Sequence, residues 1–165
     1  MNFSPKPHPL IAHWIPGSVV VILAYFWHHD CWSFSCFGEL SRTALGVFLV
    51  ASIATGELLD AARDITENII EHCFPEKKLA WTFFLDTPEK KLENFENYFY
   101  TYYVLCWNFA LGLFPVLCLE IARRGRKHWL IEIALAIACA IFFVDALLLR
   151  EQLLEVMPHH EKKKN

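Results

Sequence analysis

Charge, glycine and recognisable motifs are all scarce in this chain of 165 residues. Charged residues make up 20% of it, below the roughly 25% of a typical soluble domain. The formal net charge of −3 excludes a nucleic-acid-binding protein that works through bulk positive charge. Glycine occurs six times and low-complexity sequence is lacking, which excludes a disordered or fibrous chain.

The common catalytic and metal-binding motifs are missing too. The sequence has no His-Glu-x-x-His, no Gly-x-Ser-x-Gly, no phosphate-binding glycine loop and no Cys-x-x-Cys zinc pattern. It therefore gives no positive reason to predict an enzyme, and we predict no cofactor. Among the six cysteines, Cys31 and Cys36 fall in a loop predicted to face outward, where a disulfide could form.

Long apolar stretches are what the chain has in abundance. Hydrophobic residues make up 55%, aromatic residues 15%, and the mean hydropathy is +0.30. The apolar stretches approach the ~20 residues that a helix needs to cross a bilayer. They predict an all-α polytopic membrane protein, a single domain over 1–165, with transmembrane helices at about 9–28, 43–62, 98–122 and 129–149. Pro16-Gly17 predicts a helix start or a kink in the first of them.

The distribution of basic residues predicts the orientation. Four spans place both termini on one side of the membrane, and that side carries more Lys and Arg than the opposite side. The positive-inside rule then places both termini in the cytoplasm of a plasma (inner) membrane protein. The cluster Arg123–Lys127 is the exception, because it lies on the opposite side.

The charged region at about 57–97 is predicted to be a helical cytoplasmic extension between the second and third spans. Acidic residues at offsets of 3 and 4 form one stripe on its first helix, namely Glu57, Asp60, Asp64, Glu67 and Glu71. Arg63 is the only basic residue within that helix, and like charges at these offsets repel.

Three interpretations of the acidic stripe stay open. It is a solvated face, as most charge runs are. It pairs with basic groups such as Lys77, Lys78, Lys90 and Lys91, within or between subunits. Or, repeated around a symmetric oligomer, it lines a cation-attracting vestibule at the mouth of a pore.

A metal site is a further alternative at the same place. Carboxylates one helical turn apart can hold Mg²⁺ or Ca²⁺. With a histidine from the first span, the weak candidate ligands are His13, Glu57, Asp60 and Asp64. They support an alternative function, a membrane-embedded metal-dependent hydrolase or lipid-modifying enzyme. In a second alternative the chain is a membrane scaffold that docks a soluble cytoplasmic partner on region 57–97.

Polar residues within the apolar stretches are candidate functional residues, because ionisable groups in membrane spans usually face a bundle interior or a wet cavity. The candidates are His13, Asn108 and Asp145. For Asn108 the plainer interpretation is an interhelical hydrogen bond. For Asp145 it is pairing with Arg150 near the interface.

A short motif between the last two spans carries a resemblance. Arg123 and His128 fit the Arg-x4-His pattern of HEPN ribonucleases, in which such a pair sits at a dimer interface and cleaves RNA. In size, span count and this motif the chain resembles small membrane accessory proteins of CRISPR-type antiviral systems, some of which look like oligomeric pores. The resemblance implies Arg123 and His128 as candidate catalytic residues.

Together these features predict a homo-oligomer that contacts membrane lipid and acts as a pore-like or membrane-perturbing effector in antiviral defence. No direct nucleic-acid partner is expected.

Overall fold

Four α-helices account for most of the residues that the computed structural model describes, which are 10–29, 41–75, 79, 95, 99–123 and 129–156. A π-helical turn, η1 (Leu10–Trp14), leads directly into α1 (Ile15–His29). The others are α2 (Arg42–Cys73), α4 (Thr101–Ala122) and α5 (Trp129–Val156). The described residues contain no strand. α2, α4, α5 and the segment Ile11–His29, in which η1 runs on into α1, are long and apolar enough to cross a membrane, so the prediction of an all-α chain with four candidate spans is confirmed.

Two helices extend further than the apolar stretches. α2 is a single helix that continues past residue 62 to Cys73, and α5 continues past residue 149 to Val156. α2 begins at Ser41, whose side chain accepts a hydrogen bond from the amide of Ala44, and Pro75 follows its end. Of the two alternatives predicted at Pro16, a helix start is wrong, because η1 and α1 form one helical segment through it, and a kink stays a prediction.

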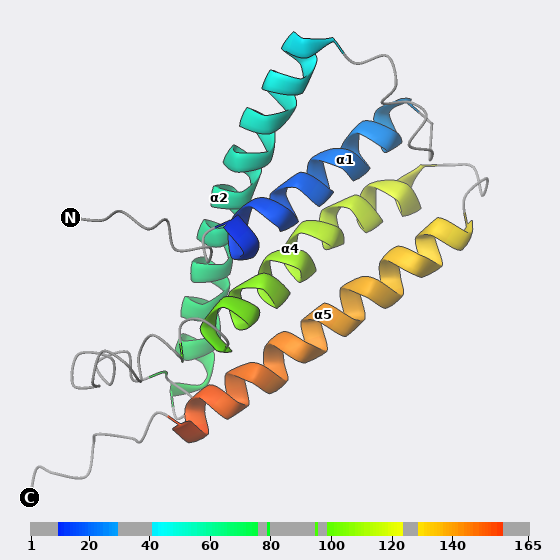
Figure 1. Cartoon of the computed structure of the whole chain (residues 1–165). Helices are drawn as coiled ribbons and strands as arrows, with labels where there is room; N and C mark the ends of the chain where they lie inside the picture. The colour runs from blue at the N-terminus through cyan, green and yellow to red at the C-terminus, as the bar shows by residue number, and fades with distance from the viewer. Residues whose placement is uncertain are drawn as a thin grey trace, which may run out of the picture.

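The helices run alternately up and down, with α4 between α1 and α5 (Figure 1). α1 and α4 are parallel: Asn108 contacts Ala12 at one end of the pair and Arg123 contacts Trp27 at the other. Ala12, Tyr103 and Leu153 share one core cluster, so α1 begins and α5 ends at the same end of the bundle. This arrangement agrees with the even number of spans predicted from the sequence, because an even number returns the last helix to the side where the first one begins.

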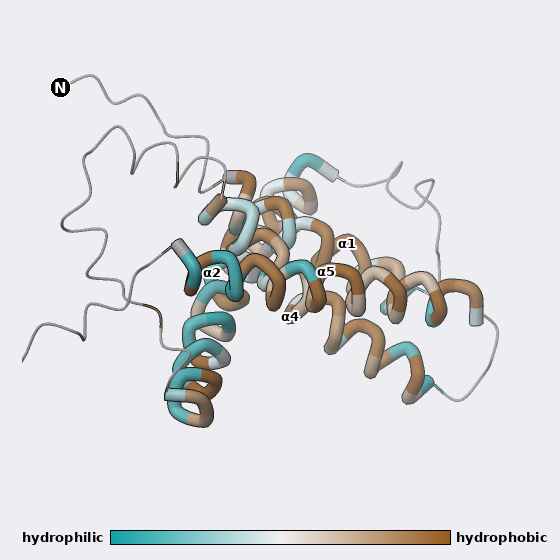
Figure 2. The backbone as a smooth tube through the Cα atoms, turned by 90° about the horizontal axis from the view of Figure 1, so that it is seen from below, coloured by the Kyte–Doolittle hydropathy of each residue, from teal (hydrophilic) through white to brown (hydrophobic). Residues whose placement is uncertain are grey.

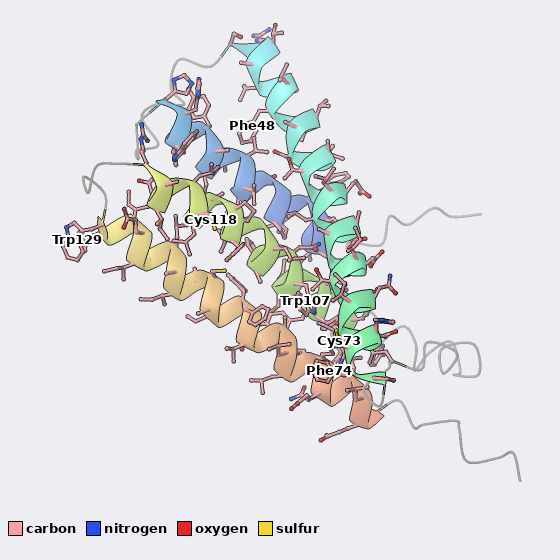
Figure 3. All side chains as sticks on the ribbon, turned by 180° about the vertical axis from the view of Figure 1, so that it is seen from behind. Phe48, Cys73, Phe74, Trp107, Cys118 and Trp129 are labelled. Carbon is pink, nitrogen blue, oxygen red and sulfur yellow. The ribbon has the colours of Figure 1, made fainter. Side chains whose placement is uncertain are left out.

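α2 crosses α1 at an angle, and small residues allow a close approach (Figure 1). A Cβ atom on Gly17 would collide with the backbone carbonyl of Ser52, and one on Gly56 with the carbonyl of His13. The Ser52 hydroxyl donates to the carbonyl of Phe48 at 2.8 Å, which satisfies it within its own helix. Phe48 lies in the wedge that opens between α1 and α2 (Figure 3). Such contacts between small residues are typical of helix packing in membranes.

The surface of the bundle is apolar and part of its interior is polar. Large hydrophobic side chains stay exposed on α2, α4 and α5, and only 11% of the apolar window of α5 is buried. Figure 2 shows hydrophobic residues along α1, α4 and α5, and Trp129 points away from the bundle in Figure 3. By contrast Arg63, Glu67, Asn108 and Arg150 are buried. Together with the four candidate spans, so many large apolar side chains on the surface indicate a membrane protein.

Candidate functional site

The candidate site lies on the second half of α2, where it packs against η1 and α4. Its centre is Arg63, which is only 5% exposed although it belongs to the most polar part of the chain's helices. A charge buried to this extent requires partners, because its desolvation costs several kcal/mol.

Three carboxylates of the same helix surround the Arg63 guanidinium. Nη1 lies 2.6 Å from Oδ1 of Asp60, Nη2 lies 2.8 Å from Oδ1 of Asp64, and Nε lies 3.5 Å from Oε1 of Glu67. These spacings of three, one and four residues place the acids around a single base. Most of the repulsion along the acidic stripe is therefore offset within α2 itself.

Glu67 connects this group of charges to the neighbouring helices. The hydroxyl of Tyr103, which is fully buried in α4, donates to Oε1 of Glu67 at 3.0 Å. Arg150 of α5 is buried as well and acts electrostatically on Glu67. Glu67 thus lies between two arginines and a tyrosine, and three helices contribute to its surroundings.

Asp60 connects the same charges to α1. Nδ1 of His13 lies 3.4 Å from Oδ1 of Asp60. Nearby, Asn108 is fully buried and donates from Nδ2 to the carbonyl oxygen of Ala12 at 2.9 Å. We call the linked residues His13, Asp60, Arg63, Glu67 and Tyr103 the charged network; it joins η1, which leads into α1, to α2 and α4.

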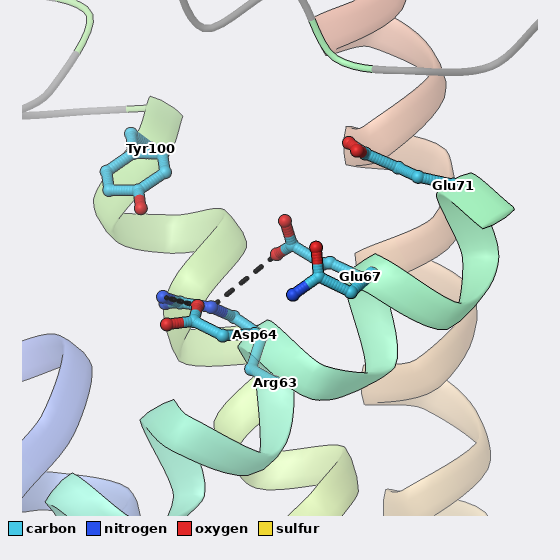
Figure 4. Close-up of a pocket in the computed structure, with 6 residues that line it drawn as sticks. Arg63, Asp64, Glu67, Glu71 and Tyr100 are labelled. Atoms are coloured by element: carbon cyan, nitrogen blue, oxygen red, sulfur yellow. Dashed lines mark hydrogen bonds and ion pairs between the residues drawn. The ribbon is translucent and has the colours of Figure 1, made fainter. Parts of the chain in front are cut away.

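A polar cavity of about 410 Å³ lies along one side of the charged network. Its lining contains three carboxylates, one guanidinium, one amide and one phenol, from Arg63, Asp64, Glu67, Asn68, Glu71 and Tyr100. Figure 4 shows Tyr100 and Glu71 on opposite sides, above the Arg63–Glu67 pair. The lining carries more negative than positive charge. We call this space the Arg63 cavity.

The opposite face of α2 is apolar along nearly its whole length. Val47, Leu58, Ile65 and Ile69 share that face, and they are 65%, 75%, 61% and 58% exposed. The acidic stripe is therefore not simply a solvated face: Glu67 is buried, Asp60 and Glu71 are partly buried, and only Glu57 and Asp64 are exposed. The predicted basic partners Lys77, Lys78, Lys90 and Lys91 lie outside the described residues.

The weak metal candidates do not converge. No three His, Cys, Asp or Glu side chains come together as a metal site in the described part of the chain. Asp60 and Asp64 both pair with Arg63 instead, and Glu57 is exposed. The ligand set His13, Glu57, Asp60 and Asp64 behind the metal-dependent hydrolase is thus wrong: a guanidinium occupies the position expected for the ion.

The remaining predicted residues lie elsewhere. Asp145 is partly buried on α5, where it acts electrostatically on Tyr102 and Cys106 of α4. Arg123 donates from Nη1 to the carbonyl of Trp27 at 3.0 Å, and its guanidinium lies 5.6 Å from the centre of the Trp27 ring. It therefore caps the C-terminal end of α1. His128, the Cys31–Cys36 loop and about half of the proposed partner-docking region (76–78, 80–94 and 96–97) lie outside the described residues.

Three residues of the site were not predicted from the sequence, namely Tyr100, Tyr103 and Arg150. In the sequence the tyrosines resemble an aromatic belt at the start of a span, so nothing marks Tyr103 as the one whose side chain is buried. Arg150 follows an apolar stretch and looks like an interfacial anchor. The one signal in the sequence was the excess of acidic residues over Arg63 on α2, which implied that the carboxylates need further partners from other helices.

Comparisons with protein-family models, with curated proteins and with solved structures each returned no match for this chain.

Proposed function

We propose that the protein is a homo-oligomeric membrane protein that acts as a pore-like or membrane-perturbing effector. The observation that carries the proposal is the charged network inside a bundle with an apolar surface. Ionisable side chains at membrane depth are costly, and where they occur they commonly mark an ion or proton pathway. Here they link η1, α2 and α4 in one continuous series of contacts at 2.6–3.5 Å.

The charge of the Arg63 cavity favours cations as the species that enters. Asp64, Glu67 and Glu71 outnumber the single guanidinium of Arg63 in its lining. Rings of carboxylates select cations in channels, and a negative mouth raises the local cation concentration. In an oligomer, several copies of this cavity around one axis form such a ring.

The apolar outer face of α2 supports association between copies. Val47, Leu58, Ile65 and Ile69 form a continuous strip about 33 Å long at 1.5 Å per residue. Lipid or a second subunit must cover it.

A flux assay in liposomes tests the proposal. The variant Asp64→Asn with Glu71→Gln removes two cavity charges and leaves Asp60 and Glu67 to balance Arg63. We expect wild-type protein to release a monovalent cation and this variant to do so more slowly. Glu57→Gln is the matched control, since Glu57 belongs to the same stripe but does not line the cavity. Equal flux in all three proteins, or none in wild type at proven reconstitution, would contradict the proposal.

Orientation and biological role are parts of the same proposal that rest on sequence. The bias in Lys and Arg places both termini in the cytoplasm, and protease digestion of a terminal tag in inverted vesicles tests this placement.

A role in antiviral defence rests on the Arg-x4-His resemblance. It predicts that cells expressing the protein with its defence system restrict phage better than cells carrying the Asp64→Asn, Glu71→Gln variant.

A further inference from the structure

The three carboxylates that line the Arg63 cavity differ in what compensates their charge. Oδ1 of Asp64 lies 2.8 Å from Nη2 of Arg63. Oε1 of Glu67 lies 3.5 Å from Nε of the same guanidinium and also accepts the hydrogen bond from Tyr103. Glu71 lines the cavity as well, but no base pairs with it among the residues that the structure describes. Its negative charge is therefore the one that stays available to a cation.

A backbone N–H group holds the Glu71 carboxylate. The amide nitrogen of Leu79, eight residues farther along the chain, donates to Oε1 of Glu71 at 3.2 Å. A donor is needed here, because Glu71 lies in the last turn of α2, which ends at Cys73, and the negative end of the helix dipole disfavours a carboxylate at that place. The hydrogen bond engages one carboxylate oxygen and leaves the other, Oε2, for a ligand in the cavity.

The Leu79 side chain anchors this donor in the core. Leu79 is only 2% exposed and belongs to the core cluster that contains Tyr103. Ile70, which precedes Glu71, and Tyr100, which lines the cavity, pack against the same cluster. One cluster thus supports both Tyr100 and the donor to Glu71, and these two residues lie on opposite sides of the cavity (Figure 4).

We propose that Glu71 is the carboxylate that binds a cation in the Arg63 cavity, and that Leu79 is the residue that positions it. This inference rests on the proposed function, in which cations enter the cavity. A freely rotating Glu71 side chain would lose conformational freedom each time a cation binds, which weakens binding by about two- to tenfold. Because the Leu79 amide already fixes Glu71, that loss does not accompany binding.

Cation flux from liposomes at a series of Na⁺ concentrations tests the positioning role, because it separates the concentration for half-maximal flux from the maximal rate. Replacing the backbone amide of Leu79 by an ester, through incorporation of the α-hydroxy analogue of leucine, removes the N–H donor and keeps the side chain. We expect the ester to raise the half-maximal Na⁺ concentration by about two- to tenfold. Leu79→Ala weakens the anchor and should shift it in the same direction.

The variant Glu71→Gln shows whether Leu79 acts through the carboxylate. With the charge removed, the ester at position 79 should no longer change the half-maximal Na⁺ concentration. Leu113→Ala is the matched control for Leu79→Ala, since Leu113 is 4% exposed in the other core cluster. It removes the same atoms from the core and should leave the half-maximal concentration unchanged.

The outcomes separate this inference from the proposed function. An unchanged half-maximal concentration in the ester variant, or an equal shift with and without Glu71→Gln, would overturn the role of Leu79 while wild-type flux still supports the pore. An unchanged half-maximal concentration in Glu71→Gln alone would show that the cation binds elsewhere. No flux in wild type at proven reconstitution would contradict the proposed function and this inference with it.

Discussion

At the scale of single residues, Arg63 shows how this chain keeps charges within a membrane bundle. Its guanidinium neutralises acids that would otherwise repel one another along one helical face, and Glu67 gains Tyr103 and Arg150 from other helices. Removing one member of such a group is costly chiefly because the others remain buried without compensation.

Arg63→Met should therefore destabilise the protein strongly. The substitution leaves Asp60 and Glu67 in the bundle without their base, and we expect the free energy of unfolding to fall by about 3–5 kcal/mol. Arg42→Met, at the exposed start of the same helix, should change it by less than about 0.5 kcal/mol. Unfolding by SDS in mixed micelles measures both. A cost for Arg63→Met no greater than that of the control would show that the ion pairs contribute little.

Two adjacent tyrosines give a sharper comparison. Tyr103 is fully buried and donates to Glu67, whereas Tyr102 is 46% exposed. Tyr103→Phe should lower the free energy of unfolding by about 1.5–3 kcal/mol, the usual contribution of a hydrogen bond to a charged group. Tyr102→Phe should change it by less than about 0.5 kcal/mol. Similar losses in the same SDS titration would rule out the Tyr103–Glu67 bond as a significant contact.

At the scale of elements, the crossing of α1 and α2 depends on the absence of two side chains. Gly17 and Gly56 lie where the two backbones approach most closely, and any Cβ there meets a backbone carbonyl that cannot rotate away. Gly46 lies on α2, as Gly56 does, but a Cβ atom there would meet open space. The sequence does not show which glycines lie at a helix crossing, and only the contacts in the structure distinguish Gly17 and Gly56 from Gly46.

Alanine at Gly56 and alanine at Gly46, both on α2, should have opposite effects on stability. Gly56→Ala should lower the free energy of unfolding by about 1–3 kcal/mol, since α1 must move outward. Gly46→Ala should raise it by about 0.5–1 kcal/mol, because alanine loses less backbone entropy in a helix. SDS titration of both variants decides the matter. Stabilisation by Gly56→Ala would mean that the helices do not cross at this point.

At the scale of the whole molecule, the outer surface carries many large apolar side chains, and lipid is the solvent that explains them. They lie exposed on α2, α4 and α5, while four ionisable side chains, Arg63, Glu67, Glu120 and Arg150, are buried beside an apolar core. The outer face of α2 is apolar even beside the acidic residues, so this helix contacts lipid or another subunit farther along than its hydrophobic stretch indicates.

Spin labels on α2 test this arrangement in liposomes. After replacement of the native cysteines, labels at Val47 and Leu58 should rarely collide with a water-soluble nickel complex. Frequent collisions with oxygen, which concentrates in lipid, would show that lipid covers this face, and rare ones that a second subunit does. A label at Ser52, which is 1% exposed, should collide rarely with both. Frequent collisions with nickel at Val47 would place this face in water and contradict its assignment as a surface covered by lipid or protein.

The sequence by itself determined the fold class and the number of candidate spans, because apolar length alone decides whether a helix can cross a bilayer. It also indicated the acidic stripe, since offsets of 3 and 4 along a helix suffice to place residues on one face. Only the tertiary structure decided that Arg63 gathers Asp60, Asp64 and Glu67, that Tyr103 donates to Glu67, and that Arg150 and Glu120 are buried. Those contacts depend on the angle and register at which α1, α2, α4 and α5 pack, and neither is encoded in the periodicity of any one helix.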